Sequence, residues 1–313
     1  MTDHDVARLL PAYRFGNVLA VKSFPHGLSG AAVYDVATDA GEFVVRVLAR
    51  SNREQWHRYI SRLRTVADAG IAPPLAWVDE GERATVSPKI AAQLSTALAD
   101  PAARPQAIAS VVDTLARLHG LPGEAFGPAD PVATARLLWD DQVAKPGFPA
   151  WAMPAAARID SAAALLDADP RRAPGHNDMN PTNVLWDGTR AWLVDWDASG
   201  LTHPYYDLAV LSMFLRFDDA LALDLLARQE NARISPAEAD TFRALRRLGG
   251  ILCGTMFFRL AGPLSAVVPQ HLDETPTLLQ FYARLRTGEL ALRSPFGQAM
   301  FGAAMLKEAI AAG

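Results

Sequence analysis

Two short segments in the C-terminal half carry the side chains best suited to chemistry. Residues 176–187 read HNDMNPTNVLWD, and residues 193–197 read LVDWD. A carboxylate can accept the proton of a hydroxyl group, and carboxylate and amide oxygens are ligands of hard cations such as Mg²⁺. The candidates of these types are Asp178, Asn183, Asp195 and Asp197. Together they favour metal-assisted chemistry at a hydroxyl group.

A predicted β-hairpin would bring these side chains together. Residues 187–190, DGTR, form a turn signal between two β-rich runs, and this predicts a hairpin with a two-residue loop. Counting back along both strands places Asn183 opposite Val194 and one step from Asp195. An amide oxygen and a carboxylate then converge, as Mg²⁺ coordination requires. Asp178, in the loop before the first strand, is expected nearby as a proton acceptor.

Each of these residues also has a structural explanation. Asp178 and Asn183 are common loop residues that hydrogen-bond their own backbone, and Asp195 could simply end a strand. The functional interpretation is favoured because the preceding His176, the hairpin and the second Asp occur together.

The first segment resembles the kinase pattern H-R-D-x-x-x-x-N, which a second metal-binding Asp follows. His176, Asp178, Asn183 and Asp195 occupy these positions, and Asn177 replaces the Arg. The chain resembles the aminoglycoside phosphotransferase and choline/ethanolamine kinase superfamily over nearly its whole length. The segments that carry the resemblance are HNDMNPTNVLWD at 176–187, LVDWDASG at 193–200, YYDLAVLS at 205–212 and LARLHG at 115–120. The H-N-D triplet, and the acidic residue two places after the metal Asp, are more similar to the choline kinase branch.

The resemblance implies a bilobal, protein-kinase-like α+β fold, with ATP as phosphate donor and Mg²⁺ as cofactor. It implies that Asp178 is the catalytic base and that Asn183 and Asp195 are the metal ligands. Asp197 would be an additional acidic residue near metal or substrate, and His176 would brace the loop. From its position before a helix expected to start at Leu208, Asp207 is predicted to cap that helix.

The N-terminal part offers candidates for nucleotide binding. Residues 26–34, HGLSGAAVY, join two predicted strands as a nucleotide-covering loop would, and Ser29 and Gly30 are its candidate contacts. Arg46 lies in the next strand, where the kinase pattern has a phosphate-binding Lys and the choline kinase branch is similar in using Arg. Its forked donors suit phosphate oxygens. An exposed Arg on an edge strand is the structural alternative.

Two features depart from the family pattern. The resemblance to the choline kinase branch implies the pattern R-x-x-E at the start of the helix that follows Arg46. Here Arg53 is followed three residues later by Trp56, and the acidic residue available for an ion pair is Glu54. Either Glu54 pairs with Arg46 after a local shift, or that ion pair is absent. Pro88-Lys89 also stand where adenine-binding backbone is expected.

The predicted elements change character along the chain. Strand signals precede residue 91, with one amphipathic helix at 53–69; the strands are expected at 18–23, 31–37, 42–48 and 84–90. Helices dominate from residue 105, apart from a β-rich segment at 184–196; they are expected at 106–119, 154–166, 206–228, 236–260, 275–292 and 297–312. We therefore predict a small β-sheet lobe over 1–90 and a mostly helical lobe over 91–313.

Composition narrows the class of partner. The chain has 313 residues, half of them apolar, and a formal net charge of −4, so nucleic acid and anionic membrane surfaces are disfavoured as partners. The N-terminus lacks a signal-peptide pattern, and the single Cys253 lies in an apolar run, where a core role is favoured over a nucleophilic one. We expect a cytoplasmic protein.

The expected activity is transfer of the γ-phosphate of ATP to a hydroxyl of a small, amine-bearing acceptor. Asp197 and several aromatic residues are the candidates for holding the amine; the aromatic residues are Trp196, Tyr205, Tyr206, Phe257, Phe258, Phe281 and Tyr282. An aminoglycoside or thiamine-type kinase, or a non-catalytic nucleotide-binding regulator, is the alternative. A metal-dependent hydrolase is disfavoured because the extra ligands of a two-metal site are missing.

Overall fold

A computed structural model describes residues 3–24, 31–48, 51–264 and 268–311. The chain forms two compact units, each built from two stretches of sequence. The first unit comprises residues 1–127 and 178–200, and the second comprises residues 128–177 and 201–313. By packing, residues 91–127 and the hairpin thus belong with the N-terminal sheet. The lobe boundary at residue 90 stays a prediction.

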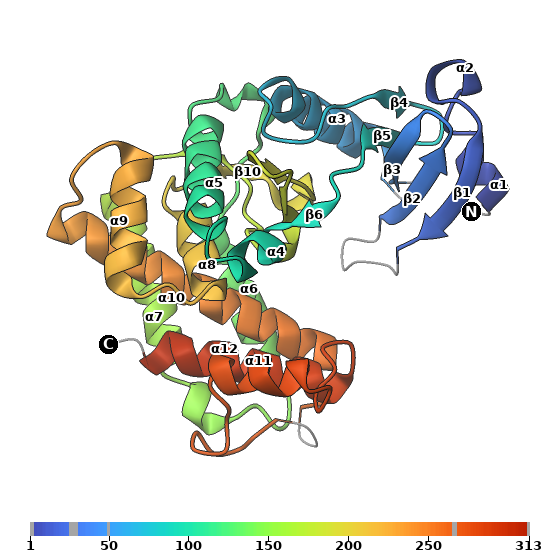
Figure 1. The fold of residues 1–313 in the computed structure, drawn as a ribbon. Coiled ribbons are helices and arrows are strands. Elements are labelled where there is room, and N and C mark those ends of the chain that lie inside the picture. The colour runs from blue at the N-terminus through green and yellow to red at the C-terminus, as the bar shows by residue number, and fades with distance from the viewer. Residues whose placement is uncertain (1–2, 25–30, 49–50, 265–267, 312–313) are drawn as a thin grey trace. The chain divides into compact units, whose positions relative to one another are not determined.

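The first unit contains a five-stranded antiparallel sheet with the order β1-β2-β3-β5-β4 (Figure 1). Its strands are β1 (Val18–Ser23), β2 (Ala32–Thr38), β3 (Gly41–Val47), β4 (Trp77–Asp79) and β5 (Ala84–Pro88). Val36, Val45 and Val86 are fully buried on one face, as the period of two of a half-buried strand requires. The four predicted strands are present, and the short β4 was not predicted.

Helix α3 (Arg53–Asp68) begins at a capping box in which Asn52 and Gln55 exchange side-chain and backbone bonds. The chain turns out of the helix at Gly70, whose φ of +65° favours glycine. Tyr59 and Leu63 are among the residues of its buried face. The helix agrees with the prediction of 53–69.

A smaller sheet in the same unit contains the hairpin. Its order is β6-β8-β9, with strands β6 (Ala92–Gln93), β8 (Val184–Trp186) and β9 (Ala191–Leu193). The Ala191 N–H donates to Ser110 Oγ on α5 at 2.9 Å, and this bond ties the hairpin to that helix. The remaining helices of the unit are α1 (Asp3–Ala7), α2 (Ala12–Phe15), α4 (Leu94–Ala99) and α5 (Arg104–His119).

The second unit is mostly helical. Its helices are α6 (Pro131–Val143), α7 (Ala155–Ala168), α8 (Tyr206–Phe214), α9 (Asp219–Glu230), α10 (Pro236–Ala261), α11 (Leu278–Arg286) and α12 (Pro295–Ala311); the short strands are β7 (Ala173–Gly175) and β10 (Gly200–Thr202). Helices α10 and α12 lie side by side (Figure 1). They approach closely at Gly254 and Gly302, where an added Cβ would lie within 3 Å of the other glycine's carbonyl oxygen.

Two helix predictions need correction, and not every helix was predicted. The helix predicted over 206–228 is two helices, because Arg216 adopts a left-handed φ of 54° and Asp218 caps α9. Helix α6 was not predicted, although Asp130 at its N-cap and Pro131 at its first position are start signals. Helix α11 is shorter than the predicted 275–292. Among the described helices, none has the length and apolar composition needed to cross a membrane.

Candidate functional site

The register of the hairpin agrees with the prediction from its turn. The Val194 N–H donates to the Asn183 carbonyl at 3.0 Å, and the Asp187 N–H donates to the Arg190 carbonyl at 3.3 Å. Asn183 therefore lies opposite Val194, and Asp195 follows at the open end of the hairpin. Local turn chemistry was sufficient to predict this arrangement.

Asn183 is oriented by Asp178. Its Nδ2 donates to Asp178 Oδ2 at 2.9 Å and to the Asp178 carbonyl at 3.0 Å. Because both donors of the amide lie on one atom, this orientation directs Oδ1 away from Asp178. The role of Asn183 as a metal ligand stays a prediction.

Asp195 has an uncommon backbone conformation, with φ 68° and ψ 69°. A left-handed residue other than Gly carries strain, and such residues cluster at functional sites. The next residue, Trp196, is buried and donates from Nε1 to the Leu193 carbonyl at 3.1 Å. The buried indole fixes the turn that directs the Asp195 carboxylate.

Arg46 contacts both acidic residues at the end of the hairpin. A single guanidinium nitrogen lies 2.8 Å from Asp195 Oδ1 and 2.7 Å from Asp197 Oδ2, and the guanidinium stands 5.5 Å from the centre of the Tyr59 ring. Its strand, β3, is the middle strand of the sheet, and the side chain is only 12% exposed. The alternative of an exposed edge-strand Arg is therefore wrong.

Asp197 is in a mixed electrostatic environment. Desolvation by partial burial raises the pKa of its carboxyl group, and the positive charge of Arg46 opposes this effect. The neighbouring carboxylate of Asp195 adds to the rise. The carboxylates of Asp195 and Asp197 thus lie on the same guanidinium nitrogen, and carboxylate oxygens are preferred ligands of hard cations.

These residues line a cavity of about 280 Å³ in the first unit. Its polar lining includes Arg46, Asn183 and Asp195. The apolar lining comes from both sheets, α3 and the segment after it; it includes Ala31, Val33, Val44, Leu63, Ala72, Pro73, Pro88, Ile90, Leu185, Leu193 and Trp196. A cavity with apolar walls and a cationic group at its polar part suits a flat ring that carries an anionic chain.

The donor set fits magnesium. Mg²⁺ prefers one or two carboxylates together with phosphate oxygens and water, and Asp195 and Asn183 supply one carboxylate and one amide oxygen. Within the described ranges, no group of three or more His, Cys, Asp or Glu side chains is placed to hold a metal. The residues therefore suit an ion that a nucleotide helps to bind.

Three N-terminal predictions have different outcomes. Ser29 and Gly30 lie outside the described residues. The Glu54 side chain is 76% exposed and pairs with Arg58 at 3.0 Å, because the two residues lie one turn apart on the solvent face of α3. Glu54 does not pair with Arg46, and the second of the two alternatives holds.

The Pro88-Lys89 segment divides between two environments. Pro88 lines the cavity, whereas the Lys89 ammonium binds Asp35 Oδ2 at 2.6 Å and lies 3.5 Å from Glu42 Oε2. Lys89 is thus part of an ion-pair group on the N-terminal sheet.

Asp207 contacts the loop that precedes the predicted base. Its buried carboxylate accepts the backbone N–H groups of His176 and Asn177, each at 2.7 Å. The prediction that Asp207 caps a helix starting at Leu208 needs correction, because α8 starts at Tyr206 and Asp207 lies within its first turn. Both bonds join residues about thirty positions apart, so no local sequence signal predicted them.

The aromatic candidates for an amine site lie mostly in the core. Trp196, Tyr205, Phe258 and Phe281 are at most 1% exposed. The Tyr205 ring already faces a cation, since the Arg171 guanidinium stands 4.7 Å from its centre. The expectation that these rings bind an acceptor amine is not supported by their burial.

The antiparallel sheet, the loop and hairpin with the kinase spacing, and the adjoining cavity define an α+β protein with a protein-kinase-like fold. A family model described as the phosphotransferase enzyme family matches residues 20–248, and the chain belongs to this family. The superfamily predicted from the sequence is confirmed.

Solved structures of other proteins share this fold. A choline/ethanolamine kinase family protein from Mesorhizobium loti is 21% identical, with 97% of this chain and 99% of that chain covered and a TM-score of 0.66. Spectinomycin phosphotransferase in complex with ADP and spectinomycin is 12% identical, with 99% of both chains covered and a TM-score of 0.60.

A curated relative matches over a shorter stretch. Homoserine kinase from Burkholderia ambifaria is 26% identical over 154 residues, which is 46% of this chain and 44% of the relative. The match thus spans less than half of that protein.

Proposed function

We propose that this phosphotransferase transfers the γ-phosphate of ATP, with Mg²⁺, to a hydroxyl group of a small, amine-bearing acceptor. The observation that carries the proposal is the arrangement of Asp178, Asn183 and Asp195. Asn183 bonds to Asp178 and stands at the same end of the hairpin as Asp195. A base is thereby held beside two metal-ligating oxygens.

The cavity provides a place for the nucleotide. Its apolar walls suit the adenine ring, and its volume of about 280 Å³ is near the lower end for small-molecule sites. Arg46 is at the polar part of the cavity, where its positively charged, forked guanidinium suits α- and β-phosphate oxygens. Mg²⁺, bound by Asn183, Asp195 and phosphate oxygens, would supply charge neutralisation during transfer.

Asp178 is the proposed base. It would accept the proton of the acceptor hydroxyl as the oxygen forms a bond to the γ-phosphorus. The bond between the γ-phosphorus and the β–γ bridging oxygen breaks, and its electron pair leaves with ADP. The role of Asn183 in this step is to orient the Asp178 carboxylate through the 2.9 Å hydrogen bond.

The names of the similar proteins support the class of acceptor. Choline, ethanolamine and homoserine are amino alcohols, and homoserine adds a carboxylate. Asp197 is the candidate for the acceptor amine, because its carboxylate lies beside the metal-binding Asp195. Aminoglycoside or thiamine phosphorylation is the enzymatic alternative, and nucleotide binding without catalysis is the regulatory one.

The test is a coupled assay of ADP formation with the purified full chain. The amine-bearing acceptors are choline, ethanolamine, homoserine, kanamycin and thiamine, and glycerol and glucose are the neutral controls. We expect ADP formation with at least one amine-bearing acceptor and none with the neutral compounds. Turnover of neutral compounds alone would overturn the acceptor class. The absence of a thermal shift with ATP and Mg²⁺ would overturn the nucleotide site itself.

A further inference from the structure

Helix α3 faces the Arg46 side chain with an aromatic ring. Tyr59 on this helix is 4% exposed, and the Arg46 guanidinium lies 5.5 Å from the centre of its ring. This distance is within the range of a cation–π interaction. Both side chains line the cavity of the first unit. Tyr59 is therefore the residue through which α3 reaches the proposed phosphate-binding group.

The acidic residue of the family pattern is replaced in the same helix. The pattern places an acid three residues after Arg53, and this position holds Trp56. Trp56 is buried, and its ring stacks on that of Tyr59, with 6.2 Å between the ring centres and 28° between the ring planes. Its Nε1 donates to the Glu80 carboxylate. The residue that replaces the acid thus packs against the residue that faces Arg46.

A second side chain on this face of α3 reaches the segment after the hairpin. Arg62 follows Tyr59 by three residues, so the two side chains lie together on the helix. The Arg62 Nη1 donates to the Ser199 carbonyl at 2.7 Å. Burial lowers the pKa of its guanidinium, and the negative charge of Asp197 opposes this effect. The face of α3 that contacts the site thus presents an aromatic ring and a cation.

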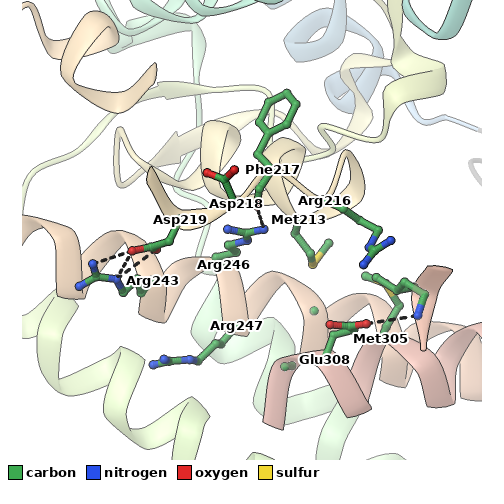
Figure 2. A pocket seen from close by; sticks show the side chains of 13 residues that line it. Met213, Arg216, Phe217, Asp218, Asp219, Arg243, Arg246, Arg247, Met305 and Glu308 are labelled. Atoms are coloured by element: carbon green, nitrogen blue, oxygen red, sulfur yellow. Dashed lines mark hydrogen bonds and ion pairs between the residues drawn. The ribbon is translucent and has the colours of Figure 1, made fainter. Parts of the chain in front are cut away.

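Acidic side chains hold a different arginine of this chain. Arg243 on α10 lines a cavity of about 560 Å³ in the second unit (Figure 2). Its guanidinium pairs with Asp219 at 2.7 Å and with Asp240 at 3.0 Å, and the dashed lines in Figure 2 mark the contact with Asp219. The opposite charges in such a pair compensate each other. An arginine held in this way serves the fold.

The carboxylates that contact Arg46 have other proposed roles. Asp195 is the proposed metal ligand, and Asp197 is the candidate for the acceptor amine. Binding of Mg²⁺ and an acceptor would engage these carboxylates while Arg46 binds phosphate oxygens. An aromatic ring attracts a guanidinium without neutralising its charge. The buried Tyr59 ring can therefore hold Arg46 in place while its two acidic partners bind other groups.

We propose that Tyr59 is the positioning residue for Arg46, and that its stacked pair with Trp56 takes the place of the ion pair in the family pattern. An arginine side chain has many rotamers, and ordering it has an entropic cost. The ring restricts Arg46 before the nucleotide arrives, so that less order is lost on binding. This role rests on the proposed function, because it requires that Arg46 binds the phosphates of ATP.

The test is isothermal titration calorimetry of the full chain with ATP and Mg²⁺. Tyr59→Leu should weaken ATP binding by about fivefold or more, whereas Tyr59→Phe should stay within about twofold of wild type because it keeps the ring. Phe242→Leu, at a fully buried aromatic residue of α10 that is not among the lining residues of either cavity, is the matched control and should keep the wild-type affinity. Unchanged affinity in Tyr59→Leu would overturn the proposal, as would equal losses in Tyr59→Phe or in Phe242→Leu.

A double-mutant cycle separates positioning of Arg46 from direct contact between the Tyr59 ring and the nucleotide. In an Arg46→Lys background, Tyr59→Leu should change ATP affinity by less than about twofold, because an ammonium lacks the planar group that stacks on a ring. The same fold-change in both backgrounds would overturn the proposal, since Tyr59 would then act independently of Arg46. A wild-type protein that binds no ATP would overturn the proposed function as well, whereas ATP binding that is equal in wild type and Tyr59→Leu would overturn this role alone.

Discussion

The Arg46 guanidinium donates to Asp195 Oδ1 at 2.8 Å and thereby joins the middle strand of the N-terminal sheet to the end of the hairpin. The same nitrogen contacts Asp197 at 2.7 Å. The proposed phosphate-binding residue therefore contacts a proposed metal ligand directly. Binding of a metal ion and phosphates would redistribute these bonds, so the choice of Arg over Lys at this position has a measurable consequence.

Arg46→Lys should raise the KM for ATP by about tenfold. Lysine keeps the charge but loses the planar fork that can reach two carboxylates and stack on Tyr59, and one charge-assisted hydrogen bond is worth about 1.5–3 kcal/mol. Steady-state kinetics with varied ATP measure the effect. Arg58→Lys, at the exposed pair with Glu54, is the control and should leave KM unchanged; equal shifts in both variants would contradict the prediction.

Asp178→Asn should lower kcat by at least about 100-fold, the scale of general-base catalysis. The variant should retain nucleotide binding, because Asp178 is not among the residues lining the cavity. Turnover and ATP affinity are measured separately, by the coupled assay and by calorimetry. Turnover close to wild type would show that Asp178 is not the base.

Asp195→Ala and Asp187→Ala should differ in metal dependence. Asp195→Ala should weaken Mg²⁺-dependent ATP binding by at least about tenfold, the scale seen for groups that support metal ligands. Asp187, at the turn end, accepts from Thr189, Arg190 and Trp192, and these bonds hold the pKa of its carboxyl group below the usual range against the effect of burial. Its removal should therefore lower the melting temperature and leave the Mg²⁺ dependence unchanged. The same metal dependence in both variants would show that the hairpin register has no functional meaning.

Asp207→Asn should destabilise the loop before the base. The carboxylate accepts two backbone N–H groups at 2.7 Å, whereas an amide has one acceptor oxygen and its NH₂ group would face a donor. We expect a loss of about 1–3 kcal/mol in the free energy of unfolding together with a lower kcat. Urea unfolding and the coupled assay measure the two effects. Unchanged stability would show that the two bonds contribute little.

Interactions between residues close together along the chain could be predicted from the sequence, whereas those between residues far apart along the chain could not. The position of Asn183 beside Asp195 followed from a turn and a period of two, both local properties. The pairing of Arg46 with Asp195 joins residues 149 positions apart, and the support of the loop by Asp207 is also long-range. One sequence gives no signal for such contacts. The break between α8 and α9 was missed for a different reason, because Arg216 occupies a position where glycine would have indicated the helix end.

The last prediction concerns His203, a buried histidine of the second unit that is 1% exposed. Its Nδ1 accepts the Tyr205 N–H at 3.2 Å, so the neutral ring carries its proton on Nε2, which lies 3.1 Å from Asp169 Oδ2. A second proton would have to displace the Tyr205 N–H. Burial lowers the pKa of His203, although Asp169 opposes the shift.

The free energy of unfolding should therefore rise with pH between the lowered pKa of folded His203 and the usual value of about 6.5 in the unfolded chain. In that window the unfolded chain binds the proton and the folded protein does not, so the contribution is present above the window and is lost on acidification. The free energy of unfolding should change by at most about 1.4 kcal/mol per pH unit through this one residue. Urea unfolding at a series of pH values measures it. His203→Gln should reduce the slope whatever its effect on absolute stability, whereas His57→Gln, on the exposed face of α3, should keep the wild-type slope. An unchanged slope in His203→Gln would show that His203 does not link stability to pH.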